Sequence, residues 1–211
     1  MNKINELLGI TEYFKAPTRM MEILFDKEVR ETTFMNFLKE FYYDVSYDWF
    51  RDYFESEYAD RKNKKQDFTP QSIIDLLAKL TDGDSHTIYE PTVGTGGVII
   101  GKWNSILIKD SIFKYEPNKY LFVCEELSDR AIPFLLFNLC IRGMNAVVIH
   151  GDVLTRESYG VFLIQNVDNN YLGFSNLNVM PYTEEVEKYF NVKFVEKKYK
   201  AHVENGVIYE N

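Results

Sequence analysis

From Phe68 onward, short apolar runs alternate with amphipathic helical segments, and this alternation restricts the fold more than any other feature of the sequence. Runs typical of strands occupy residues 86–90, 120–126, 145–150 and 161–165. Helices are predicted from Pro70 (with Thr69 as its N-cap), after the turn at 91–97, and over 129–142. This rhythm is typical of a mostly parallel sheet flanked by helices. The sequence therefore predicts an α/β domain over residues 61–211.

The first sixty residues follow a different pattern. Apolar and aromatic residues recur there at helical spacing, which predicts helices at about 3–14, 18–42 and 46–59. The segment carries 13 acidic and 7 basic residues, so its outer face is expected to be acidic. An aromatic stripe of this kind is typical of a packing surface. We therefore expect residues 1–60 to form a helical region that packs on the α/β domain or on a partner.

The charge of the chain limits its partners. Lys and Arg total 24 against 32 Asp and Glu, a net charge of −8, whereas a protein that binds duplex DNA tightly usually has a basic face. Basic residues gather at 61–65 and in a tail, predicted as a hairpin turning at 204–206, that contains Lys193, Lys197, Lys198 and Lys200. These groups are either solvated surface or a weak DNA contact. A protein partner or a homo-oligomer is also expected.

Composition excludes several other classes of protein. With 45% hydrophobic residues and 16% aromatics the chain can bury a core, yet no apolar run approaches the roughly 20 residues that cross a bilayer. The first residues lack the apolar segment of a signal peptide. Cys124 and Cys140, both in apolar stretches, suggest a reducing cytoplasm. The three histidines are scattered without zinc-site spacing, so no metal is expected.

A glycine-rich turn, Pro91-Thr92-Val93-Gly94-Thr95-Gly96-Gly97, follows the strand predicted at 86–90. Glycine lets the backbone approach a ligand closely, and the N-terminus of the next helix favours negative charge. The turn has neither the Gly-Lys-Ser/Thr ending of a phosphate-binding loop nor the glycine spacing of dinucleotide folds. Glu90, just before the turn, indicates a ligand with an amino group.

Acidic residues end three successive strands, at Glu90, at Glu125-Glu126 and at Asp152. In α/β sheets, ligands bind beyond the carboxyl ends of the strands. Each acid alone is most simply a capping or surface residue, but their joint placement describes a pocket for a cationic nucleoside. S-adenosylmethionine fits, with its ammonium, ribose hydroxyls and adenine amino group each facing a carboxylate.

These motifs together resemble the N6-adenine DNA methyltransferase family, and most closely the modification subunits of type I restriction–modification systems. The similarity runs over about 66–166 and includes Phe68-Thr69-Pro70, Glu90 to Gly97, Glu126-Leu127-Ser128, Phe137-Asn138-Leu139 and Gly151-Asp152-Val153-Leu154. It implies a Rossmann-like methyltransferase fold that binds S-adenosylmethionine and methylates DNA. The cofactor-binding residues that it implies are Phe68, Thr69, Pro70, Glu90, Pro91, Thr92, Gly94, Thr95, Gly96, Gly97, Glu126 (ribose) and Asp152 (adenine).

The sequence departs from the family in its fourth strand. Family members end that strand in (Asp/Asn/Ser)-Pro-Pro-(Tyr/Phe), whose polar side chain and ring hold the flipped adenine. Here Gln165 and Asn166 are the candidate catalytic residues, but no Pro-Pro follows them, and Asn178-Val179-Met180-Pro181-Tyr182 is a displaced alternative. About forty-five residues follow Asn166, fewer than family members have. Two interpretations stay open: a DNA adenine methyltransferase, and a catalytically inactive protein of the same fold, of phage or mobile-element origin, that acts through a protein partner.

Overall fold

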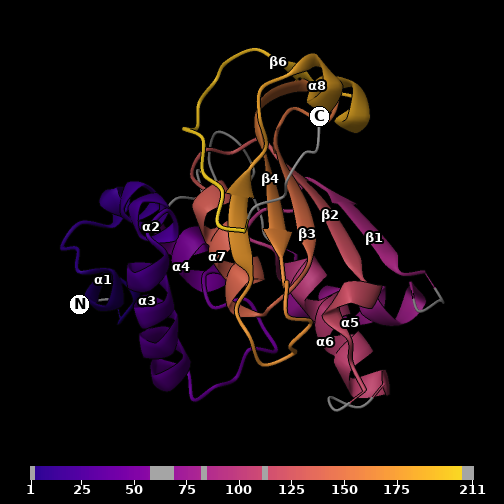
Figure 1. The fold of residues 1–211 in the computed structure, drawn as a ribbon. Coiled ribbons are helices and arrows are strands. Elements are labelled where there is room, and N and C mark those ends of the chain that lie inside the picture. Colours follow the sequence, from indigo (N-terminus) through magenta and orange to yellow (C-terminus); the bar gives the residue numbers. More distant parts are fainter. Residues whose placement is uncertain (1–2, 58–68, 82–84, 111–113, 206–211) are drawn as a thin grey trace. The chain divides into compact units, whose positions relative to one another are not determined.

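The structure is a computed structural model, and it describes residues 3–57, 69–81, 85–110 and 114–205 (Figure 1). The chain forms two compact units that interleave along the sequence. The first comprises Met1–Asp84, Val93–Tyr115 and Asp129–Asn138, and the second comprises Ser85–Thr92, Glu116–Ser128 and Leu139–Asn211. The domain limit predicted at residue 60 lies outside the described residues, so it stays a prediction. None of the described helices is long and apolar enough to cross a membrane.

The first unit is helical. Its elements are α1 (Lys3–Leu8), η1 (Tyr13–Lys15), α2 (Ala16–Leu24), α3 (Lys27–Glu40), α4 (Arg51–Glu57), α5 (Gln71–Leu80), α6 (Gly97–Asp110) and most of α7 (Ile132–Ile141). The single helix predicted over 18–42 is wrong, because Asp26 adopts an extended conformation and its carboxylate accepts a hydrogen bond from Val29 N at 3.1 Å. A new helix therefore begins at Lys27.

The limits of two other predicted helices also shift. The helix predicted over 3–14 ends at Leu8, and the one predicted over 46–59 begins only at Arg51. Pro70 occupies the N-cap of α5 in an extended conformation (φ −57°, ψ 147°), so Thr69 is not the N-cap that we predicted. The helix itself is present, displaced by one residue from its expected start.

Aromatic side chains form the core of the first unit. Phe34, Phe37 and Phe50 surround Phe137 of α7, with ring centroids 4.7, 4.8 and 5.2 Å away, and all four are fully buried. Phe50 also contacts Phe134, at 5.0 Å. Such pairs contribute about 0.5–1.5 kcal/mol beyond the burial of their area. The aromatic stripe of the first sixty residues is therefore a packing surface, as predicted.

The second unit is a six-stranded sheet in the order β1-β2-β3-β4-β5, with β6 pairing β4 (Figure 1). Its elements are β1 (Thr87–Pro91), β2 (Leu121–Glu126), β3 (Ala146–Gly151), β4 (Glu157–Gln165), β5 (Asn176–Val179), α8 (Glu184–Phe190) and β6 (Lys193–Phe194). The pairs β1–β2, β2–β3 and β4–β6 are parallel, whereas β4 is antiparallel to both β3 and β5. The predicted mostly parallel α/β sheet is confirmed.

The fourth strand reverses direction because its connection is short. Only residues 152–156 join β3 to β4, whereas a parallel pair needs a crossover of about a dozen residues or more. Asp152 N donates to Glu157 O at 2.8 Å, and Arg156 N donates to Asp152 O at 2.8 Å, which closes a tight turn. The carboxyl end of β4 therefore lies beside the start of β3, where Ala146 pairs with Ile164.

The chain beyond β5 covers one face of this sheet. Val192 packs on Val147, Ile149 and Val161, with Phe190 and Phe194 against the same cluster. The sequence analysis missed α8 and the parallel pairing of Lys193 and Phe194 with Glu157 and Ser158. The hairpin predicted to turn at 204–206 stays a prediction. Residue 206, at the predicted turn, lies outside the described residues.

Candidate cofactor site

The parallel pairing of β1, β2 and β3 brings their acidic ends to one edge of the second unit. Pro91 is in register with Glu125, and Glu126 with His150, two residues before Asp152. Glu90 precedes Pro91 within β1. The three acids predicted to converge, Glu90, Glu126 and Asp152, are therefore at the same edge of the sheet, and each is partly exposed.

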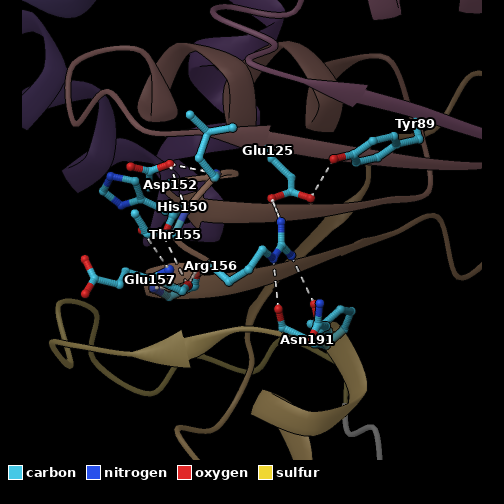
Figure 2. Close-up of polar contacts among 12 residues, drawn as sticks. Tyr89, Glu125, His150, Asp152, Thr155, Arg156, Glu157 and Asn191 are labelled. Carbon is cyan, nitrogen blue, oxygen red and sulfur yellow. Dashed lines mark hydrogen bonds and ion pairs between the residues drawn. The ribbon is translucent and has the colours of Figure 1, made fainter.

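Glu125 and Glu126 differ in their surroundings, since neighbouring residues of a strand point to opposite faces. Figure 2 shows Glu125 between Tyr89 and Arg156. The Tyr89 hydroxyl donates to Glu125 Oε1 at 2.9 Å, and Arg156 Nη1 donates to Oε2 at 2.6 Å. Burial raises the pKa of Tyr89, and the hydrogen bond to Glu125 raises it further. Glu125 is thus a buried carboxylate whose charge is already compensated.

Arg156 connects Glu125 to the end of α8 (Figure 2). Its Nε donates to Asn191 O at 2.9 Å, and its Nη2 donates to Phe190 O at 3.2 Å. A guanidinium at the C-terminus of a helix also interacts favourably with the helix dipole. Arg156 has a left-handed backbone (φ 63°) in the β3–β4 turn. It therefore fixes α8 to the carboxyl edge, a role that sequence spacing did not indicate.

Glu126 and Asp152 are held by backbone donors that leave both side chains partly exposed. Ser128 N donates to Glu126 Oε1 at 2.7 Å. Leu154 N and Thr155 N donate to Asp152 Oδ1 at 2.8 and 3.4 Å, an Asx turn that orients the carboxylate. Both carboxylates thus stay accessible at this edge, whereas Glu125 takes part in an internal ion pair.

The glycine-rich turn adopts a strained backbone. Thr92, Gly94 and Gly96 all have positive φ, at 60°, 62° and 103°. A side chain at Gly96 would also lie 3.1 Å from Leu135 Cδ1, so only glycine fits there without displacement. Gly96 N donates to Val93 O at 3.1 Å, and α6 begins at Gly97. Pro91 and Thr92 are exposed, and Gly94 is half-buried.

A buried polar network inside the first unit fixes this turn. Thr95 Oγ1 donates to Asp48 Oδ2 at 2.5 Å. Asn138 Nδ2 donates to Asp48 Oδ1 and to Thr95 O, each at 2.8 Å. Thr95 and Asn138 are fully buried. Thr95, predicted as a cofactor ligand, therefore uses its hydroxyl within the protein and positions the turn.

Asp48 is the residue of this network that the sequence analysis missed. Its Oδ1 also accepts from Phe50 N at 2.9 Å, just before α4. The only local signal was an acidic residue shortly before a helix, which is typical of an ordinary cap. Its contacts with Thr95 and Asn138, 47 and 90 residues away, depend on tertiary structure alone.

The Thr-Pro pair lies at the start of α5 in the first unit. Thr69 is half-buried and Pro70 is exposed, whereas Phe68 lies outside the described residues. Helix α5 packs closely on α6, because a side chain at Gly101 would lie 2.3 Å from Ile74 Cγ2. The predicted contacts of Thr69 and Pro70 with a cofactor stay a prediction.

Asn166 and Gln165 are not at the acidic edge. Because β4 is antiparallel, its carboxyl end lies at the amino end of β3, where Asn166 N donates to Asn145 Oδ1 at 2.7 Å. Asn166 Nδ2 donates to Gly143 O and Asn170 O, and its Oδ1 accepts from Asn170 N. The catalytic roles predicted for Asn166 and Gln165 stay predictions, and their position at the opposite edge of the sheet does not support them.

The displaced alternative, residues 178–182, is also engaged internally. It begins in β5 and not in the loop that we expected. Asn178 Nδ2 donates to Asn205 Oδ1 at 3.0 Å, and its Oδ1 accepts from Glu204 N at 2.9 Å. The Tyr182 hydroxyl donates to Tyr159 O and accepts from Tyr199 N, each at 2.9 Å. Neither side chain is arranged to hold a base.

A cavity of about 450 Å³ lies on the β4–β5 side of the second unit. Its lining is mostly apolar and comprises Leu163, Asn178, Val179, Met180, Pro181, Tyr182, Lys197, Ala201 and Val203. None of the predicted cofactor-binding residues belongs to it. The cavity therefore has no part in the candidate site.

The remaining reactive side chains have structural surroundings. His150 is fully buried at the end of β3. Its Nε2 lies 3.3 Å from Leu127 O, and its Nδ1 lies 2.6 Å from the Tyr199 hydroxyl. Burial raises the pKa of the Cys124 thiol well above its ordinary value, and the charge of Glu90 raises it further. Both cysteines are free and buried, and the described residues contain no group of His, Cys, Asp and Glu that could hold a metal ion.

The sheet and its acidic edge define the class of protein: an α/β protein compatible with the Rossmann-like methyltransferase fold. A family model for N-6 DNA methylase matches residues 45–176, more than half of the chain, so the chain belongs to the N-6 DNA methylase family. The match includes Asp48, Thr95 and Asn138, and excludes α8 and β6. The comparison with curated proteins gives no match.

Replacing Asp48 with Ala should lower the free energy of unfolding by about 3 kcal/mol, because Thr95 Oγ1 and Asn138 Nδ2 lose a buried acceptor. Urea denaturation measures the loss. Asp52→Ala is the matched control, since Asp52 is exposed in the first turn of α4 and should matter by less than about 1 kcal/mol. Equal effects of the two substitutions would contradict the network.

Replacing Arg156 with Ala should lower the free energy of unfolding by about 2–4 kcal/mol, because Glu125 stays buried without its ion pair. Adding Glu125→Gln should restore part of this loss, since the uncompensated charge is removed. Lys119→Ala, which breaks the exposed pair with Glu116, should change stability by at most about 1 kcal/mol. A double variant as unstable as Arg156→Ala would show that the buried charge is not the cause.

Proposed function

We propose that this DNA methyltransferase-like chain binds S-adenosylmethionine at the carboxyl edge of β1, β2 and β3. The observation that supports the proposal is the convergence of partly exposed carboxylates, Glu126 and Asp152 above all, at the ends of neighbouring parallel strands. Sheets of this class bind ligands beyond the carboxyl ends of their strands. Family membership makes a methyl donor the expected ligand.

The chemistry of the acids fits this cofactor. Glu126 would accept hydrogen bonds from the ribose hydroxyls, Asp152 from the adenine amino group, and Glu90 would face the ammonium group. The resemblance adds Phe68, Thr69, Pro70, Pro91, Thr92, Gly94, Thr95, Gly96 and Gly97. When bound, the cofactor supplies an electrophilic methyl group. A cytoplasmic location and a place in a restriction–modification system belong to the same proposal.

A second candidate function is that of a catalytically inactive family member that acts through a partner. Asn166 and Asn178 are the two asparagines that resemble the family's base-binding residue. The side-chain amides of both form hydrogen bonds within the protein. Among the described residues, β1 pairs with β2 alone, so no strand carrying a base-binding motif lies on its other side. These observations favour cofactor binding without methyl transfer by this chain alone.

Asp152→Asn should weaken binding of S-adenosylhomocysteine by about tenfold or more, measured by titration calorimetry. The amide oxygen can still accept from Leu154 N and Thr155 N, so the turn is kept, but the amide nitrogen would oppose the adenine amino group. Asp168→Asn, at an exposed position, is the control. The absence of detectable binding to the parent chain, or an unchanged affinity in Asp152→Asn, would remove the proposed site.

Methyl transfer from tritiated S-adenosylmethionine to mixed DNA substrates should be at background level for this chain alone. The physical reason is that Asn166, Asn178 and Tyr182 use their polar groups in internal hydrogen bonds, so the two candidate motifs offer no stacking that would offset the few kcal/mol needed to flip the base. Robust incorporation that disappears in Asp152→Asn but is kept in Asp168→Asn would overturn the inactive alternative and establish an enzyme.

A further inference from the structure

Of the two groups of basic residues in this acidic chain, the one at 61–65 lies outside the described residues and the other lies in the described tail. Residues 192–203 contain a single carboxylate, Glu196, and the exposed lysines Lys193, Lys197, Lys198 and Lys200. The whole chain has a net charge of −8. The segment is therefore locally positive, whereas the chain as a whole is negative. It lies beyond the family match, which ends at residue 176, so the family does not account for it.

The segment begins at the acidic edge of the sheet. Lys193 and Phe194 of β6 pair with Glu157 and Ser158, the first residues of β4, which follow the turn that contains Asp152 (Figure 1). Further along, the Tyr199 hydroxyl lies 2.6 Å from Nδ1 of His150, at the end of β3. The lysines thus accompany the strand ends at which we place the cofactor.

The backbone of the segment is held in place by hydrogen bonds. Lys193 N donates to Arg156 O at 2.8 Å, and Val195 N donates to Ser158 O at 3.0 Å. Tyr199 N donates to the Tyr182 hydroxyl at 2.9 Å. The lysines are therefore presented on a fixed backbone, which lowers the entropic cost when an anion orders their side chains.

Two carboxylates lie beside the start of the segment. Glu157 lies opposite Lys193 in the β4–β6 pair, and Glu187 accepts from Phe194 N. Lys197, Lys198 and Lys200 follow further along the segment and are exposed. Lys198 Nζ lies 5.6 Å from the centre of the Tyr159 ring, a cation–π distance that keeps the ammonium near the sheet.

We propose that residues 192–203 form a binding surface for the phosphate backbone of duplex DNA. This inference rests on the proposed function for the class of partner: a protein that methylates or reads adenine in DNA needs to hold phosphates near its cofactor edge. Such interactions position a protein on DNA without reading sequence. Three to four lysines in an acidic chain give weak, strongly salt-dependent binding. Because the total attraction to DNA is small, removing the charges of this segment should lower the DNA affinity measurably.

The test is fluorescence anisotropy of a labelled DNA duplex with the full chain, repeated over a salt series. Wild-type protein should bind at low salt. The quadruple variant Lys193→Gln, Lys197→Gln, Lys198→Gln and Lys200→Gln should bind about tenfold or more weakly. The slope of log affinity against log salt should become shallower by about 0.9 for each phosphate that the variant no longer neutralises.

Two further variants control for charge and folding. A variant with Lys27, Lys39, Lys79 and Lys114 changed to Gln has the same net charge, and all four positions are exposed, so it should keep wild-type affinity. Changing the four lysines of the segment to Arg should also keep it, because the positive charges remain. Equal weakening in both Gln variants, no weakening in either, or no binding by wild-type protein would overturn the proposal. So would polyglutamate that competes as well as DNA, since that result indicates an acidic protein partner.

Calorimetry with S-adenosylhomocysteine on the same proteins separates this inference from the proposed function. The Gln variant of the segment should keep the parent affinity for the cofactor, whereas Asp152→Asn should lose cofactor affinity and still bind DNA. Lysine-dependent DNA binding without any cofactor binding would contradict the proposed function alone. Cofactor binding without lysine-dependent DNA binding would contradict this inference alone.

Discussion

The parallel pairing of β1, β2 and β3 is the constraint on which the site depends. Parallel strands run in one direction, so their carboxyl ends meet at a single edge, and residues that are far apart in sequence become neighbours there. Glu126 and Asp152 are adjacent for that reason alone. A single antiparallel step among these three strands would have sent one acid to the opposite edge and left no common site.

The short β3–β4 turn separates residues, whereas the parallel pairing of β1, β2 and β3 brings them together. It reverses the chain after Asp152, so the residues that follow β4 are carried away from the acidic edge. The same turn provides Arg156, which joins Glu125 to the end of α8 and so brings the lysine-rich segment to that edge. This one turn therefore separates the candidate cofactor site from Asn166, the residue predicted to hold the base. It also brings the lysine-rich segment beside the candidate site.

Much of the fold could be predicted because it depends on local patterns. Strands β1 to β4, the helix before Gly143 and the glycine turn follow from apolar periodicity and from residue types that permit a positive φ. Periodicity did not reveal β5 or β6, and it identifies a strand such as β4 without its orientation. The sequence analysis missed the helix break at Asp26 because a single N-cap residue, inside a long stretch of helical spacing, causes it. The roles of Asp48 and Arg156 depend on interactions between distant residues, which no local pattern contains.

The central claim is that the carboxyl edge of β1–β3 holds an adenosyl ligand. The most direct measurement is a crystal structure of the chain with bound S-adenosylhomocysteine. Our account predicts ligand density at that edge, with the ribose at Glu126 and the adenine amino group at Asp152. Density at the amino ends of these strands, or an edge filled by the protein's own side chains, would contradict it.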